Sequence, residues 1–299
     1  MKASDYIAYF LEAQGVTTVF EMSGGMITHM LDSMHQLTKI DIVSMHHEQS
    51  ASFAADAFGR FTGVPGVAMA TSGPGATNLL TGIASCYFDS VPGVFITGQV
   101  NTFELRADRP IRQLGFQETD IASMAQPVCK ACFELRDASE IPQALEDAFR
   151  IALSGRPGPV LVDIPMNVQR GDIPAPANGF VRVERQRVPH ELTPAVFDDL
   201  AQALASAQKP LILAGRGVSS AFQLEEFRKF AHLVHVPVVT SLLAVDAIPY
   251  DDPLRVGYIG SYGNRWANKA LGNSDFILVL GARLDIRQTG ADTKYFKEG

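Results

Sequence analysis

Two short stretches decide the fold of this chain: residues 45–56, MHHEQSASFAAD, and residues 70–78, ATSGPGATN. The first places a carboxylate, Glu48, at the start of an apolar helix. The second places a Gly-Pro-Gly turn between a buried strand and another helix, and glycines there let the backbone approach a ligand closely. That helix would begin at the carboxyl edge of a sheet, where open α/β sheets bind ligands. Taken singly, each stretch has a plainer reading, as an exposed helix-start glutamate and a strand-to-helix joint.

The composition is typical of a soluble α/β enzyme. The chain has 299 residues, enough for about two domains with large cores. Charged residues make up 19%, the net charge is -7 and the mean hydropathy is +0.08, so there is no basic footprint for nucleic acid. The sequence has no run of 18 apolar residues, and its start, MKASD, lacks a signal-peptide core. We expect a cytoplasmic protein, without nucleic-acid or membrane partners, that binds small molecules and further copies of itself.

Three cysteines, Cys86, Cys129 and Cys132, argue against a disulfide framework. The last two form the motif CKAC, whose spacing allows a redox pair or half of a zinc site. The sequence has no second pair, and the alternation across residues 128–133 fits a strand better than the helix start of a thioredoxin motif. A structural role is therefore the favoured interpretation.

Apolar periodicity switches repeatedly between strand and helix. Apolar runs predict strands at residues 16–20, 40–43, 66–71, 94–97 and 159–164. Helical periodicity lies between them, ending at Gly15 and continuing over residues 50–60, 76–88 and 139–153. This alternation requires right-handed crossovers, so it predicts an α/β fold with a mostly parallel sheet covered on both faces.

The chain is expected to divide into residues 1–170, a linker at 171–190 and a second domain at 191–299. The linker prediction rests on the Pro and Gly density after residue 170 and on the loss of apolar rhythm. A new βα pattern then starts, with Thr193 as N-cap before Pro194. Further strands are predicted at 211–214, 236–240 and 276–280, with a helix at about 220–233.

The whole chain resembles the amino-terminal half of the acetolactate synthase family of thiamine-diphosphate enzymes. The matching stretches are residues 23–25, 47–49, 71–78, 96–100, 116–120 and 154–160. The resemblance implies a three-layer α/β/α pyrimidine-binding domain over residues 1–170, followed by a Rossmann-like, FAD-binding-like middle domain that is incomplete at residue 299.

For the first domain the resemblance implies a catalytic role for Glu48, which would hold a proton at N1' of the thiamine pyrimidine. An apolar pocket beside it would raise its pKa toward the working range. The helix residues expected to line that pocket are Phe53, Ala54, Ala57 and Phe58. The further implied catalytic, cofactor-binding and substrate-pocket residues are Gln117, Gly24, Gly25, Pro74, Asn78, Phe116 and Lys130.

For the second domain the resemblance implies a site for an FAD without a redox role. Glycines after strands allow backbone N–H groups to reach a pyrophosphate, and arginine adds charge-assisted bonds. The implied cofactor-binding residues are Gly215, Gly217, Gly260, Gly263, Gly281, Arg283 and Asp285, and Arg287 would hold the second keto-acid substrate. For the glycines alone, ordinary packing is the simpler interpretation.

Several positions depart from the family pattern near the pocket. Met22 and Ser23 stand where Tyr and Pro are usual, Ser50 stands where Gly is usual, and Ile286 replaces an acidic residue. These departures leave the acceptor substrate open, including a keto sugar. The family holds the diphosphate through Mg²⁺ in a third domain, with Gly-Asp-Gly and Asn-Asn motifs that this sequence lacks. We therefore expect no metal ligand in this chain and interpret it as about half of an enzyme, inactive alone.

The predicted activity is a carboligation. A thiamine-diphosphate enzyme of this kind joins the acyl carbanion from decarboxylated pyruvate to a second carbonyl compound, as in branched-chain amino acid biosynthesis. One alternative is a related lyase or transferase, such as a 2-keto-acid decarboxylase or a sulfoacetaldehyde acetyltransferase. Another is a non-catalytic binding protein that kept the fold. The resemblance also implies a homodimer or homotetramer, with residues 79–88 as a candidate contact helix.

Overall fold

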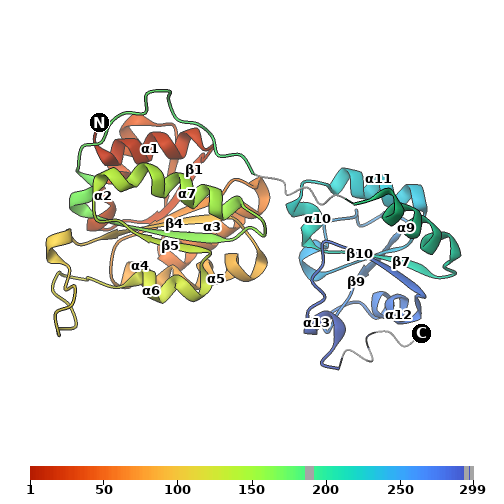
Figure 1. The fold of residues 1–299 in the computed structure, drawn as a ribbon. Coiled ribbons are helices and arrows are strands. Elements are labelled where there is room, and N and C mark those ends of the chain that lie inside the picture. The colour runs from red at the N-terminus through yellow and green to blue at the C-terminus, as the bar shows by residue number, and fades with distance from the viewer. Residues whose placement is uncertain (186–191, 293–295, 297–299) are drawn as a thin grey trace. The chain divides into compact units, whose positions relative to one another are not determined.

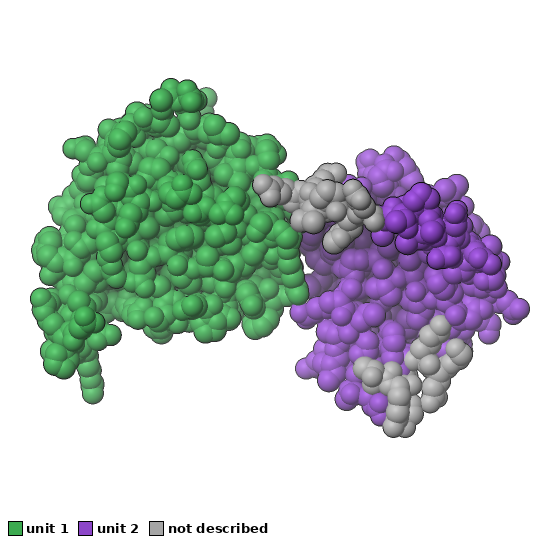
Figure 2. Space-filling view, viewed as in Figure 1, with its two compact units in different colours: residues 1–189 green, residues 190–299 purple. Residues whose placement is uncertain are grey.

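The computed structural model describes residues 1–185, 192–292 and 296. The chain divides into two compact units, Met1–Pro189 and His190–Gly299 (Figure 2). Each unit is an α/β domain built on its own sheet. Among the described residues, no helix has both the length and the apolar character needed to cross a lipid bilayer.

Unit 1 contains a six-stranded parallel sheet in the order β2-β1-β3-β4-β6-β5. Its strands are β1 (Thr18–Met22), β2 (Asp41–Ser44), β3 (Gly66–Ala70), β4 (Gly93–Gln99), β5 (Ala131–Glu134) and β6 (Pro159–Pro165). Its α-helices are α1 (Ala3–Ala13), α2 (Thr28–Leu37), α3 (Glu48–Thr62), α4 (Pro74–Asn78), α5 (Leu80–Asp89), α6 (Ile121–Ala125), α7 (Ile141–Leu153) and α8 (Met166–Gln169). The 3-10 helices are η1 (Gly25–Ile27), η2 (Thr102–Glu104), η3 (Gln126–Val128) and η4 (Ala138–Glu140).

Helices cover both faces of this sheet, so the predicted three-layer α/β/α architecture is confirmed (Figure 1). Helices α1, α2 and α7 pack on one face, over a core that includes Phe10, Met30 and Phe149. Helices α3, α5 and α6 pack on the other face. Strands β3, β4 and β6 are buried along their whole length, as central parallel strands are.

Helix α3 buries a face of small residues rather than the predicted aromatic one. The His47 side chain accepts a hydrogen bond from the Gln49 N–H at its start, and Gly63 ends it in the left-handed conformation. Its buried side chains include Ala51, Ser52 and Ala55. Helix α5 approaches this face so closely that a Cβ at Gly82 would lie 2.2 Å from the Ser52 Oγ.

Of the four residues expected to line an apolar pocket beside Glu48, none is fully buried. Phe53 is 43% exposed, Ala57 is exposed, and Ala54 and Phe58 are only half-buried. The apolar periodicity of this helix fits two faces, and the face of small residues packs against α5.

Two predicted segments differ in detail from the structure. The helix expected over residues 76–88 is two helices, α4 and α5, that meet at Leu79. Part of the predicted linker packs along α1: the Gln14 side chain donates to the Val181 carbonyl and accepts from the Val183 N–H. Phe180 stacks edge-on against Tyr6 with ring centroids 4.8 Å apart. The predicted linker residues 186–190 lie outside the described residues.

Unit 2 contains a four-stranded parallel sheet in the order β10-β7-β8-β9. Its strands are β7 (Pro210–Ala214), β8 (Val238–Thr240), β9 (Arg255–Tyr258) and β10 (Phe276–Leu280). Its helices are α9 (Pro194–Ser206), α10 (Arg216–Ser220), α11 (Leu224–Val234), η5 (Leu242–Ala244), α12 (Arg265–Asn273) and α13 (Ile286–Thr289). The chain order reverses between β7 and β10, which is the switch point where Rossmann-like sheets bind ligands.

Candidate functional site

The carboxyl edge of the unit 1 sheet collects the loops that carry most of the predicted site. Strand β1 leads to Gly24, β2 leads to Glu48 and β3 leads to the turn at Gly73. Because neighbouring parallel strands end at the same edge of a sheet, these loops meet there. Residue 117 reaches the same place from the segment between β4 and α6.

Glu48 is the first residue of α3 and is half-buried. The Asn78 Nδ2, at the end of α4, donates a 2.9 Å hydrogen bond to Glu48 Oε2. The other carboxylate oxygen, Oε1, lies toward Gly75. A Cβ added at Gly75 would be 3.2 Å from Oε1 and 2.8 Å from the Thr71 Cγ2. The amide thus fixes one oxygen of the carboxylate, and the missing side chain at Gly75 leaves room beside the other.

The Gly-Pro-Gly turn packs against Gln117. Gly73 has a φ of 69°, which favours glycine, and a Cβ there would lie 2.8 Å from the Gln117 Cβ. Gln117 itself has a φ of 65°, an uncommon conformation for a residue other than glycine. Such backbone conformations persist only where the surroundings enforce them, and they are found preferentially at functional sites. The neighbouring Phe116 is 79% exposed.

Gly24 approaches the turn from β1. A Cβ at Gly24 would lie 2.4 Å from the Thr71 Cβ, and the Met26 N–H donates to Thr71 Oγ1 at 3.3 Å. A Cβ at Gly25, by contrast, would meet none of the described atoms within 4 Å. The structure therefore brings Gly24, Glu48, Pro74, Asn78 and Gln117 into one cluster. Thr71 lies at the centre of the cluster, because Gly24, Gly75 and the Met26 N–H all approach its side chain. The sequence did not indicate this role, although Thr71 begins one of the matched stretches.

A buried carboxyl group supports this cluster from within the sheet. Asp163 on β6 accepts from Thr97 Oγ1 at 2.6 Å and from Gln99 Nε2 at 3.0 Å. The same Gln99 amide donates to the Thr119 carbonyl at 2.8 Å, two residues beyond Gln117. Burial is the main cause that raises the pKa of Asp163 to about 6, against the lowering effect of its two hydrogen bonds. Residues 96–100 are one of the stretches that match the family. Their hydrogen bonds to Asp163 could not be predicted from sequence, because these bonds depend on the pairing of β4 with β6.

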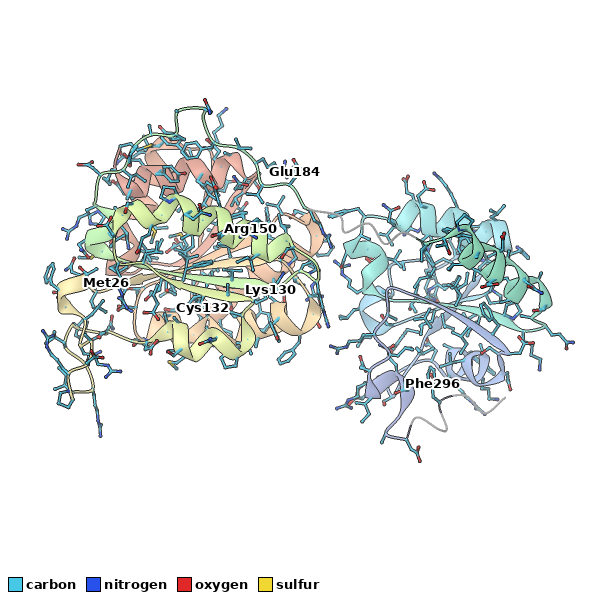
Figure 3. The ribbon with its side chains drawn as sticks, viewed as in Figure 1. Met26, Lys130, Cys132, Arg150, Glu184 and Phe296 are labelled. Carbon is cyan, nitrogen blue, oxygen red and sulfur yellow. The ribbon has the colours of Figure 1, made fainter. Side chains whose placement is uncertain are left out.

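Lys130 does not belong to this cluster. It directly precedes β5, so it lies at the amino edge of the sheet, whereas Glu48 lies at the carboxyl edge. In Figure 3, Lys130 and Met26, which follows β1, lie at opposite ends of this sheet. Its Nζ donates to the Ile151 carbonyl and, at 2.7 Å, to the Ser154 carbonyl, at the end of α7. Burial is the main cause that lowers its pKa, and the charge of Arg185 adds to this. In unit 1, Lys130 satisfies the last carbonyls of a helix rather than lining the pocket predicted for it.

In unit 2 the predicted glycines pack against each other. The Gly215 N–H donates to the Leu280 carbonyl at 2.8 Å, and the Gly217 N–H donates to the Gly281 carbonyl at 2.9 Å. A Cβ at Gly217 would lie 2.6 Å from the Gly281 Cα. These glycines therefore join the loops after β7 and β10 at the switch point. Their N–H groups are engaged with backbone, so Gly215 and Gly217 do not supply donors for a pyrophosphate.

The remaining predicted residues of unit 2 gather around α13. Asp285 Oδ1 accepts from the Arg287 N–H at 2.9 Å, and Asp285 Oδ2 lies 3.3 Å from Arg283 Nε. Gly260 has a φ of 108°, and a Cβ there would lie 2.7 Å from the Arg287 carbonyl. Gly263 closes the same loop, since its N–H donates to the Gly260 carbonyl at 2.8 Å. The Arg287 guanidinium donates to the Tyr262 hydroxyl at 3.1 Å.

The unit 1 cluster fits one end of a thiamine cofactor. Such a fit needs a carboxylate for the ring nitrogen and a surface without side chains for the ring. Glu48 supplies the first, with one oxygen fixed by Asn78. Gly75, where a Cβ would crowd Glu48 and Thr71, supplies the second. The fit to FAD in unit 2 is poorer, because four of the five expected glycines, Gly215, Gly217, Gly260 and Gly263, already donate their N–H groups within the protein.

The fold and this cluster define a cofactor-binding α/β enzyme domain, and comparison with known proteins specifies the class. Residues 1–124 match the family described as thiamine pyrophosphate enzyme, N-terminal TPP binding domain, and residues 197–299 match its central domain. The chain belongs to the thiamine pyrophosphate enzyme family.

Its similar relatives are acetolactate synthases. The probable acetolactate synthase large subunit of Methanocaldococcus jannaschii is 38% identical over 99% of this chain and 49% of that protein. The acetolactate synthase isozyme 2 large subunit of Escherichia coli is 38% identical over 97% and 51%. Acetolactate synthase 2 of Nicotiana tabacum is 37% identical over 97% and 43%. The chain spans about half the length of these relatives.

Proposed function

We propose that this chain is part of a thiamine-diphosphate-dependent carboligase resembling acetolactate synthase. The enzyme would decarboxylate pyruvate and join the remaining two-carbon acyl unit to a second carbonyl compound. When bound, the cofactor supplies the carbon nucleophile and the electron sink for this reaction. The observation that carries the proposal is the Glu48–Asn78 pair beside Gly75, because it holds a carboxylate where a pyrimidine nitrogen can meet it.

The residues of unit 1 have distinct roles in this proposal. Glu48 holds a proton at the ring nitrogen and exchanges it during the cycle. Asn78 is a positioning residue that fixes the carboxylate through Oε2. Gln117, held against Gly73, presents its amide to the reacting groups, and the exposed Phe116 would cover the substrate. Arg287 of unit 2 is the residue proposed to hold the acceptor carbonyl compound.

The other components follow from the family and are proposals of the same kind. Mg²⁺ would be held with the diphosphate by a further domain, and the active site would form between subunits of a homodimer or homotetramer. FAD would bind at unit 2 without the N–H groups of Gly215 and Gly217, which backbone carbonyls already engage. We expect the 299 residues alone to be inactive. An absorbance spectrum of the purified full-length enzyme tests the FAD proposal, because a bound flavin colours the protein.

The direct test of the activity uses the full-length enzyme with pyruvate, thiamine diphosphate and Mg²⁺. We expect carbon dioxide release together with a five-carbon hydroxy-keto acid, identified by mass spectrometry. Release of carbon dioxide with acetaldehyde alone would instead identify a decarboxylase. Binding of the cofactor with no turnover of pyruvate or other 2-keto acids would contradict an enzymatic role.

A further inference from the structure

The amino edge of β5 carries a pair of thiols that the proposed reaction does not use. Cys129 follows η3, and Cys132 lies within β5. Neither thiol is in a disulfide, and both are half-buried. A hydrogen bond joins the two side chains. The backbone bend at Lys130 allows this contact, which a continuous strand from residue 128 would prevent because alternate side chains point to opposite faces.

The pair opens onto a pocket of about 300 Å³. Its polar lining comes from α6, η3 and β5, and Figure 3 shows Lys130 and Cys132 close together on this part of the unit. The lining residues besides the two cysteines are Ala122, Ser123, Gln126, Lys130, Ala131 and Glu134. Both cysteines therefore line a pocket with room for a small polar molecule.

The two thiols are chemically unequal. The hydrogen bond from Cys129 lowers the pKa of Cys132, against burial and the charge of Glu134, which raise it. The same hydrogen bond, with burial, raises the pKa of Cys129. Cys132 is thus the better thiolate, and the thiolate is the reactive form of cysteine. Cys86 differs from both: it is fully buried on α5, and burial raises its pKa.

We propose that Cys129 and Cys132 form an oxidisable dithiol, a modification site that a low-molecular-weight disulfide converts to an intramolecular disulfide. The Cys132 thiolate attacks one sulfur of the oxidant, forms a mixed disulfide and releases the first small thiolate. The Cys129 thiol then loses its proton to solvent, and its sulfur attacks Cys132 Sγ and releases the second small thiolate. Two protein thiols are oxidised and one small disulfide is reduced to two thiols, so atoms and electrons balance.

Tryptic mapping provides a direct test. Cleavage after Arg112, Lys130 and Arg136 places Cys129 on peptide 113–130 and Cys132 on peptide 131–136. The folded chain is incubated with oxidised glutathione, quenched in acid, denatured, alkylated and digested. We expect peptides 113–130 and 131–136 joined by a disulfide, an intact mass lower by two hydrogens and an alkylated Cys86. Free alkylated Cys129 and Cys132, or a disulfide between two chains, would overturn the proposal.

Variants separate the roles of the two thiols. Cys129→Ser cannot close the ring, so we expect it to retain one glutathionyl group on Cys132. Cys86→Ser is the matched control and should form the disulfide as the wild type does. Circular dichroism confirms that each variant is folded, and the mapping of the unmutated chain does not depend on them. A Cys86→Ser chain that no longer forms the disulfide would contradict the assignment.

Discussion

At the residue scale, the candidate site consists of one carboxylate and the groups that limit its position. Asn78 holds Oε2 of Glu48, while Gly75 and Gly24 remove the side chains that would otherwise crowd Thr71. The family resemblance implies Glu48, Asn78 and Gln117 as site residues, and the structure brings them together at the carboxyl edge of the unit 1 sheet. The alternation over residues 128–133 predicts a strand that runs through Lys130, but β5 begins only at Ala131, so Lys130 lies at the amino edge.

Two adjacent glycines provide a matched pair of variants. A Cβ at Gly24 would lie 2.4 Å from the Thr71 Cβ, whereas one at Gly25 would meet no described atom within 4 Å. We expect Gly24→Ala to lower the free energy of unfolding by about 1–3 kcal/mol, as overpacking does. Gly25→Ala should change it by less than about 0.5 kcal/mol. Urea unfolding monitored by circular dichroism measures both, and equal effects would contradict the close approach.

The role of Asn78 is tested against its neighbour on α4. Hydrogen bonds to charged groups contribute roughly 1.5–3 kcal/mol, so Asn78→Ala should lower the turnover of the full-length enzyme by about 10- to 100-fold. Thr77→Ala is the control, because the Thr77 hydroxyl donates only to the Pro74 carbonyl in the same turn at 3.1 Å. Steady-state kinetics with saturating cofactor measures the effect. An Asn78→Ala enzyme as active as Thr77→Ala would show that Glu48 needs no positioning residue.

At the element scale, long apolar segments were predictable and marginal ones were not. Strands β3, β4 and β6 are buried throughout, and each contains an apolar run, which ends at Thr97 in β4 and is interrupted by Asp163 in β6. Strand β9, with Arg255 and Gly257, carries no such signal, and it exists because it can pair with β8. On α3, small residues such as Ala51 and Ala55 show their packing role only against α5.

Asp163 links β6 to β4 through its hydrogen bonds, and its raised pKa makes the free energy of unfolding depend on pH. Its pKa rises from 3.8 to about 6 on folding, so the folded state binds this proton more tightly than the unfolded state. The stabilisation is fully present below about pH 4 and is lost as the pH rises through about 6, a change of at most about 3 kcal/mol at about 1.36 kcal/mol per pKa unit.

Asp163→Asn removes this titration. As the pH rises from about 4 to 7, we expect the free energy of unfolding of wild type to fall relative to that of Asp163→Asn. Urea unfolding of unit 1 at several pH values measures that difference, and groups common to both proteins cancel. A difference that stays constant with pH, or moves in favour of the wild type, would refute the assignment.

At the scale of the whole molecule, the proposed dimer needs an apolar surface on unit 1. Helix α5 buries Gly82, Ile83 and Cys86 inward, while Tyr87 and Phe88 are 40% and 58% exposed. Half of the predicted contact helix is thus core and half is surface. Homodimer interfaces are richer in apolar and aromatic side chains than the remaining surface. This favours the exposed flank of α5, formed by Tyr87 and Phe88, as a contact surface.

Phe88→Glu tests that flank. In the full-length enzyme we expect it to shift the molar mass in light scattering from the oligomer toward the monomer, because an interface core disfavours a buried unpaired charge. The control Leu233→Glu makes a similar change at a residue of unit 2 that is 84% exposed. It should leave the oligomer intact. A Phe88→Glu enzyme that stays oligomeric would exclude this flank from the interface.

The central claim is that Glu48 exchanges a proton with the bound cofactor. Its most direct test is the turnover of Glu48→Gln in the full-length enzyme, relative to wild type, with saturating thiamine diphosphate and Mg²⁺. Glutamine keeps a hydrogen bond but cannot exchange the proton, so we expect a loss of about 10²–10⁴-fold with the fold unchanged. A Glu48→Gln enzyme that retains more than roughly a tenth of the wild-type rate would contradict the role assigned to this carboxylate.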